Sequence, residues 1–130
     1  MAGKCRKSIL LIDDDPLVLN TVTRLLEKSG HQVSAFQNPK EAIQEAMMDD
    51  FDLVISDIRM PEVNGLQAIR YMREMRSQQG KNQIPEIFIT GYASDYGEEA
   101  EKLKPRAIVH KPFEIADFIT VVNNALVIGD

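Results

Sequence analysis

The sequence predicts an α/β fold: a doubly wound, five-stranded parallel sheet with five helices, arranged in three layers. Five short apolar runs of strand length alternate strictly with longer segments in which apolar residues recur every three or four positions. The runs are apolar on both faces, which is typical of parallel strands buried beneath helices on both sides. Right-handed crossovers leave few topologies, and among these we expect the doubly wound strand order 2-1-3-4-5.

The first two β–α units are marked by clear start and stop signals. The predicted strands are the run SILLI at Ser8–Ile12 and a second run near Gln32–Phe36. Ser29-Gly30 ends the first helix, and Asn38-Pro39 resembles an N-cap followed by proline at the first helical position. The two helices carry apolar stripes at Val18, Val22, Leu25 and Leu26, and at Ala42, Ile43, Ala46 and Met47.

Three further units complete the pattern. Their strands are expected at Leu53–Ser56, Glu86–Thr90 and Ala107–His110, and their helices at about Gly65–Gln78, between Tyr92 and Lys104, and along the apolar repeat from Ile115 to Leu126. Pro105 lacks an amide hydrogen, so it should end the weaker helix before it early.

The totals fit one small domain. With 130 residues, 44% of them hydrophobic, the chain can bury a core without disulfides, and its single cysteine excludes an intramolecular one. We therefore expect one domain over residues 1–130, with a core from about residue 8 to 128. The net charge of −5 argues against nucleic-acid binding, and no apolar run could cross a membrane, so we expect a cytoplasmic protein.

Polar side chains stand at the carboxyl ends of four of the five predicted strands. They are Asp13, Asp14 and Asp15 after the first strand, Asp57 after the third, Thr90 at the end of the fourth and Lys111 after the fifth. In an open parallel sheet these ends meet at one edge, where ligands bind. A cluster of carboxylates without sulfur ligands suits a hard divalent cation, and we expect Mg²⁺. Together with a hydroxyl and an ammonium, they meet the needs of phosphoryl transfer.

Each of these residues also has an ordinary structural interpretation. Asp15 precedes Pro16 and reads as the N-cap of the first helix. Asp57 could cap a turn, Thr90 could bond to backbone, and Lys111 could be a solvated lysine. The joint pattern at four separate strand ends is what indicates a phosphoryl site.

The chain resembles the receiver domain of bacterial two-component response regulators over essentially its whole length. The matching segments are ILLIDDDP, DLVISDIRMPEVNGL, IFITGYA and VHKPF, in that order and spacing. The resemblance implies a flavodoxin-like fold and a phosphorylation-dependent switch that is not a stand-alone enzyme. The implied partners are a sensor histidine kinase or phosphotransfer protein and a downstream protein or fused output domain. A homodimer of the activated domain is a further possibility that the resemblance raises.

The same resemblance implies roles for individual residues. Asp57 would accept the phosphoryl group, and Asp14 and Asp57 would bind Mg²⁺ (or Mn²⁺) directly, together with the backbone carbonyl of Arg59. Asp13 would act on the metal mostly through water. Thr90 would hydrogen-bond the phosphoryl group and move toward it on activation.

Two more implications concern the lysine and a loop. Lys111 would form a salt bridge to the phosphoryl group, and its peptide bond to Pro112 would be cis. Gly65 would allow the loop backbone a conformation that a side chain would hinder.

The sequence departs from the usual pattern of this family in three respects. Ile108 stands where the family usually has Tyr or Phe, so it reads as a core strand residue and the aromatic part of the switch is in doubt. Pro105 lies where a Gly-Ala pair is common. Arg59 and Tyr92 flank the expected path of hydrolytic water, and we hypothesise that their bulk slows loss of the acyl phosphate.

Two alternatives remain open. A phosphatase of the haloacid-dehalogenase type would use Asp13 as its nucleophile, although Asp15-Pro16 suits a helix cap better than a general acid and there is no room for a cap domain. A receiver-like interaction module would need no phosphate at all. Labelling with a small phosphodonor distinguishes the three, since the label would lie on Asp57, on Asp13 or on neither.

Overall fold

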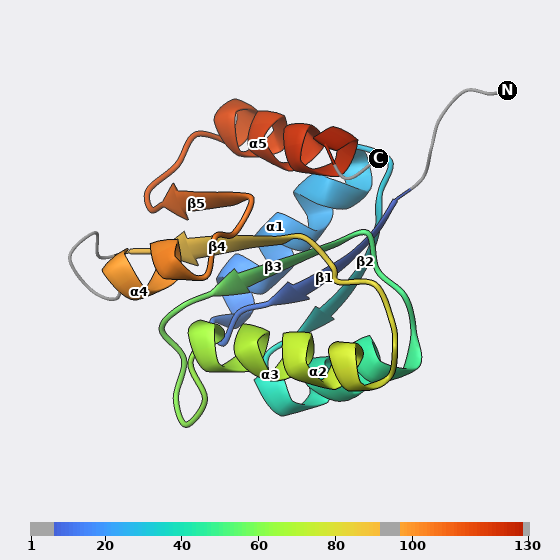
Figure 1. The fold of residues 1–130 in the computed structure, drawn as a ribbon. Helices are drawn as coiled ribbons and strands as arrows, with labels where there is room; N and C mark the ends of the chain where they lie inside the picture. Colours follow the sequence, from blue (N-terminus) through green and yellow to red (C-terminus); the bar gives the residue numbers. More distant parts are fainter. Residues whose placement is uncertain (1–6, 92–96, 129–130) are drawn as a thin grey trace, which may run out of the picture.

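The computed structural model describes residues 7–91 and 97–128, and within these ranges strands and helices alternate strictly (Figure 1). The strands are β1 (Ser8–Ile12), β2 (Gln32–Phe36), β3 (Leu53–Asp57), β4 (Glu86–Thr90) and β5 (Ala107–His110). The helices are α1 (Pro16–Lys28), α2 (Pro39–Met48), α3 (Gly65–Gln78), α4 (Gly97–Lys102) and α5 (Ile115–Ile128). None of the described helices is long and apolar enough to cross a membrane.

The five strands form one parallel sheet in the order β2-β1-β3-β4-β5, as predicted. The chain moves outward from β1 to the edge strand β2 and then crosses back to β3, so the strand order reverses between β1 and β3. This reversal opens a crevice beyond the carboxyl ends of these two strands, where open α/β folds bind ligands.

Helices cover both faces of the sheet, which gives the three predicted layers (Figure 1). Helices α1 and α5 pack on one face around Phe118, which is fully buried. Helices α2, α3 and α4 supply buried residues to the other face, around Phe88. The central strands β3 and β4 are buried along their whole length, because helices cover both of their faces.

Helix caps account for where the first three helices begin. The side chain of Asp15 accepts the amide of Leu17 at 3.0 Å, and that of Asn38 accepts the amide of Lys40 at 2.9 Å. Asn64 caps α3 through a reciprocal pair of hydrogen bonds with the side chain and amide of a glutamine three residues later. The N-cap assignments made from Asp15-Pro16 and Asn38-Pro39 are thereby confirmed.

One predicted strand boundary needs adjustment, and one predicted helix end is confirmed. Strand β3 is one residue longer than expected and includes Asp57, so this carboxylate is anchored within the sheet instead of following it. Helix α4 ends at Lys102, before Lys104 takes a left-handed φ of 55° and Pro105 follows, in agreement with the early end that we predicted. Residues 92–96, where that helix was expected to begin, lie outside the described residues.

At the end of the sheet where the strands begin, the buried guanidinium of Arg76, on α3, hydrogen-bonds to the carboxyl end of α2. Its Nη1 donates to the carbonyl of Ala46 at 2.9 Å, and its Nε donates to the carbonyl of Asn82 at 2.8 Å. Lys81 donates to the carbonyl of Met47 at 2.9 Å, so two cations satisfy carbonyls at the carboxyl end of α2.

Candidate functional site

The register of the sheet brings the polar strand ends to one edge. Ile12 pairs with Ser56, so Asp13 and Asp57 follow directly on neighbouring strands. Asp57 pairs with Ile89, which places Thr90 one position further on β4. Thr90 pairs in turn with His110, immediately before Lys111. The predicted side chains therefore gather because their strands end at nearly the same level.

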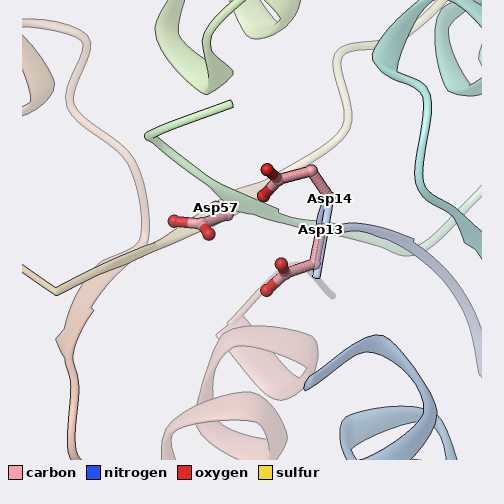
Figure 2. Close-up of side chains that lie close together, drawn as sticks. All are labelled: Asp13, Asp14 and Asp57. Carbon is pink, nitrogen blue, oxygen red and sulfur yellow. The ribbon is translucent and has the colours of Figure 1, made fainter. Parts of the chain in front are cut away.

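Three carboxylates form the centre of the site. One oxygen from each of Asp13, Asp14 and Asp57 can be chosen so that all three lie within 4.8 Å of one another. Figure 2 shows these side chains close together, with Asp13 and Asp14 coming from the end of β1 and Asp57 from β3. Asp13 and Asp57 are almost fully buried, with exposed fractions of 1% and 6%.

Lys111 supplies the positive charge that this cluster needs. Its Nζ lies 3.3 Å from Oδ2 of Asp57 and 3.8 Å from Oδ2 of Asp13. The Lys111–Pro112 peptide bond is cis, as the family resemblance implied. The ammonium thus bridges two carboxylates from different strands.

Burial raises the pKa of both inner carboxyl groups. Desolvation and repulsion from Asp57 raise the pKa of Asp13 from 3.8 to about 6, although the Asp15 amide and Lys111 partly oppose the shift. Desolvation also raises the pKa of Asp57, where Lys111 and the backbone amide of Arg59 favour the ionised form. Without a further cation, keeping these two carboxyl groups ionised therefore costs free energy.

The donor set fits a hard divalent cation. Oδ1 of Asp13 accepts the amide of Asp15 at 2.9 Å, whereas its buried Oδ2 has no hydrogen-bond partner. A buried carboxylate oxygen that accepts no hydrogen bond, beside two further carboxylates, is the ligand environment that Mg²⁺ or Mn²⁺ prefers. The residues present are compatible with such an ion.

Gly65 is needed here for space. Its φ is not left-handed, but a Cβ at this position would stand only 2.2 Å from the carbonyl oxygen of Asp57. Its amide also donates to the carbonyl of Ile58 at 2.8 Å. A side chain would therefore hinder the backbone at this position, as expected, and glycine lets α3 begin in contact with the Asp57 peptide.

The remaining residues singled out from the sequence lie in different parts of the structure. Asp15 caps α1, as its position before Pro16 predicted. Ile108 is a half-buried strand residue that packs on the α2–α4 face. With Thr90, it lines a cavity of about 510 Å³ beneath α4. Arg59 is exposed, and Tyr92 lies outside the described residues, so the hypothesis about these two stays a prediction.

Two polar residues at the site were not singled out from the sequence. The hydroxyl of Ser56 donates to the carbonyl of Asp57 at 2.9 Å, and the side chain of Gln37 donates to the carbonyl of Asp14 at 3.3 Å. The only sequence signal for Ser56 is a hydroxyl inside an otherwise apolar strand, LVISD. Nothing in the pattern marks Gln37.

An open parallel α/β sheet with buried carboxylates and a lysine at its switch point is the arrangement that phosphoryl transfer to a carboxylate requires. The family model for the response regulator receiver domain matches residues 9–123, and the chain belongs to this family. Receiver domains are generally switch domains that bind Mg²⁺ at an acidic site and interact with histidine kinases or phosphotransfer proteins.

Relatives and solved structures agree with this assignment. The chain is 28% identical to the response regulator receiver protein CpdR of Brucella abortus, over 93% of this chain and 98% of the relative. It is also 28% identical to the polar-differentiation response regulator DivK of Brucella anthropi, over 92% and 96%. A CheY-like receiver domain protein from Methanospirillum hungatei has the same fold, with a TM-score of 0.84 at 24% identity over 96% and 97% of the two chains.

Proposed function

We propose that Asp57 is the phosphoacceptor of this receiver domain and takes its phosphoryl group from a phosphohistidine of a sensor kinase or phosphotransfer protein. A carboxylate oxygen of Asp57 would attack phosphorus while the bond to the histidine nitrogen breaks and its electron pair returns to the imidazole. The observation that carries the proposal is the position of Asp57, which ends the central strand β3 between two carboxylates and an ammonium.

The surrounding residues have complementary roles in this proposal. Asp13, Asp14, Asp57 and the backbone carbonyl of Arg59 would hold Mg²⁺ or Mn²⁺, with Asp13 acting mostly through water. The bound ion would neutralise the oxygens of the transferring phosphoryl group. Lys111 would form a salt bridge to the phosphoryl group once it is attached. The distance of 3.3 Å between Nζ of Lys111 and Oδ2 of Asp57 supports this role.

Thr90 would transmit the event to the surface. It is buried at the end of β4 beside β5 and lines the cavity beneath α4, so a shift of its hydroxyl toward the phosphoryl group would alter packing there. The new charge thereby biases a two-state element and changes which protein surface is presented. Output would pass through protein contacts, to a separate protein, a fused domain or a second copy, without direct contact to nucleic acid.

The proposal extends to the organisation of the chain. We propose one receiver domain over residues 1–130, with a core from about residue 8 to 128, that acts in the cytoplasm as a switch and not as a stand-alone enzyme. The family match over residues 9–123 and the family's histidine-kinase partners support this view.

Phosphodonor labelling tests the assignment of Asp57. The protein is incubated with acetyl phosphate and Mg²⁺, and hydroxylamine-labile adducts are mapped by mass spectrometry. We expect label on Asp57 that Asp57→Asn abolishes. Asp15→Asn is the matched control, because asparagine also caps helices and this carboxylate is exposed, so it should label normally.

Two results would overturn the assignment. Label on Asp13 would indicate the haloacid-dehalogenase type of chemistry, in which Asp13 is the nucleophile. No label on any carboxylate would indicate a receiver-like module that acts without phosphate.

A further inference from the structure

We infer that Ser56 is a positioning residue for phosphorylation, because its hydroxyl holds the peptide group of Asp57 in place; this inference rests on Asp57 being the acceptor. Ser56 Oγ donates to the carbonyl oxygen of Asp57 at 2.9 Å, in a fully buried position. The carboxylate of Asp57 accepts a hydrogen bond from Lys111, and the serine hydroxyl holds the main chain of the same residue.

The sheet itself does not provide this anchor. The pairing of β1 with β3 ends at Ile12 and Ser56, one residue before Asp57. Ile58, the residue after β3, donates its amide to the carbonyl of Ile89 on β4, which lies on the other side of β3 from β1. The Asp57 carbonyl therefore projects past the end of β1, where the serine hydroxyl meets it.

Water cannot easily replace the hydroxyl. The Cα of Gly65 packs so closely on this carbonyl that an added Cβ would stand 2.2 Å from the oxygen. Asp57 as a whole is only 6% exposed. A buried carbonyl that loses its donor is left unsatisfied, and the peptide group can recover a partner only by rotating. Such a rotation would move the carboxylate that the same residue carries.

Packing alone does not explain a serine at this position. Alternation along β3 places Ser56 on the same face as Val54 and Ile58, within the apolar layer covered by α2 and α3. A small side chain is all that packing requires there, and alanine would meet that need without burying a hydroxyl. The hydrogen bond to Asp57 is the interaction that only the hydroxyl supplies.

Two isosteric comparisons test this role. Ser56→Ala removes only the oxygen, while Ser56→Val and Ser56→Thr have nearly the same shape and differ in the hydroxyl. We expect Ser56→Ala to lower the maximal rate of Asp57 labelling by acetyl phosphate about fivefold, the worth of one buried neutral hydrogen bond. Ser56→Thr should label about fivefold faster than Ser56→Val. The acetyl phosphate concentration at half-maximal rate should change little, because no donor-binding group is lost.

The controls separate positioning from stability. Thr23→Val removes a hydroxyl whose oxygen is buried without a hydrogen-bond partner, so it should leave labelling unchanged. All rates are measured well below each variant's melting temperature. Ser56→Ala that labels at the wild-type rate, or Thr and Val variants that label equally, would overturn the inference.

The wild-type protein distinguishes this failure from a failure of the proposed function. If the wild type labels on Asp57 and only the serine comparisons show no difference, Ser56 is not a positioning residue. If the wild type carries no label on Asp57, the acceptor assignment itself is wrong and the inference falls with it.

Discussion

Substitution of Gly65 by alanine tests how tightly α3 is packed against β3, the strand that carries Asp57. The added Cβ would lie 2.2 Å from the Asp57 carbonyl oxygen and 3.0 Å from both the Asp57 carbonyl carbon and Ile58 Cα. Real Cβ atoms keep at least 3.0 Å from such neighbours, so the two backbone segments must separate by at least 0.8 Å. These atoms all belong to backbone, and no flexible side chain can give way.

The expected loss follows from two opposing contributions. Forcing a methyl group into a packed site costs ~1–3 kcal/mol, whereas replacing glycine within a helix returns up to ~1 kcal/mol. We therefore expect a net loss of about 1–2 kcal/mol, which in a domain of this size lowers the melting temperature by about 4–8 °C.

Thermal unfolding followed by circular dichroism measures this difference. Gly97→Ala is the matched control, because a Cβ there meets nothing within 4 Å at the start of α4, and its melting temperature should stay the same or rise slightly. Labelling of Asp57 should also slow in Gly65→Ala, since its peptide is displaced. A Gly65→Ala protein that melts within about 1 °C of the wild type would refute the packing argument.

Three further predictions concern charge. Arg76→Met leaves the buried carbonyl of Ala46 and the partly buried carbonyl of Asn82 without their guanidinium donor and should lower the free energy of unfolding in urea by ~2–3 kcal/mol, while exposed Arg70→Met should not; equal losses would contradict this. Asp13 has its pKa raised from 3.8 to about 6, so the folded state binds more protons between these values and stability falls as pH rises through this window. In Mg²⁺-free buffer above pH 6, Asp13→Asn should therefore be more stable than the wild type by ~3 kcal/mol, and equal stability would contradict this. Lys111→Met removes the ammonium from the carboxylates, so calorimetry should show Mg²⁺ binding roughly tenfold more tightly, and weaker binding would count against the site.

The sequence predicts the fold and the location of the site for the same reason. Strand-length apolar runs alternating with helical stripes determine the layers, and parallel strands bring their carboxyl ends to one edge. Asp13, Asp57, Thr90 and Lys111 could therefore be grouped without coordinates. Caps such as Asp15 were also predictable, because proline after an acidic residue marks a helix start locally.

Other features depend on contacts that no local pattern encodes. The reason for Gly65 is the approach of α3 to a carbonyl eight residues earlier, and not a backbone angle. The bond from Ser56 to Asp57 follows from where β1 happens to stop, which a sequence run defines only to within a residue or two. Lys111 was expected at the edge, but its bridging of two carboxylates depends on the path of the chain beyond β5.

The charges at this edge also explain why the domain can act as a switch. Three carboxylates against one ammonium leave the site two charges short of neutrality, which a divalent cation would balance. Phosphorylation of Asp57, as proposed, would replace its single charge with up to two charges on the phosphoryl group, so the balance would be broken again by about one charge. In the proposed function, donors such as Thr90 and Lys111 would then gain by moving toward the new charge, and the strands to which they belong would follow. The charge balance that supports Asp57 as the proposed acceptor would therefore also make the phosphorylated state structurally different.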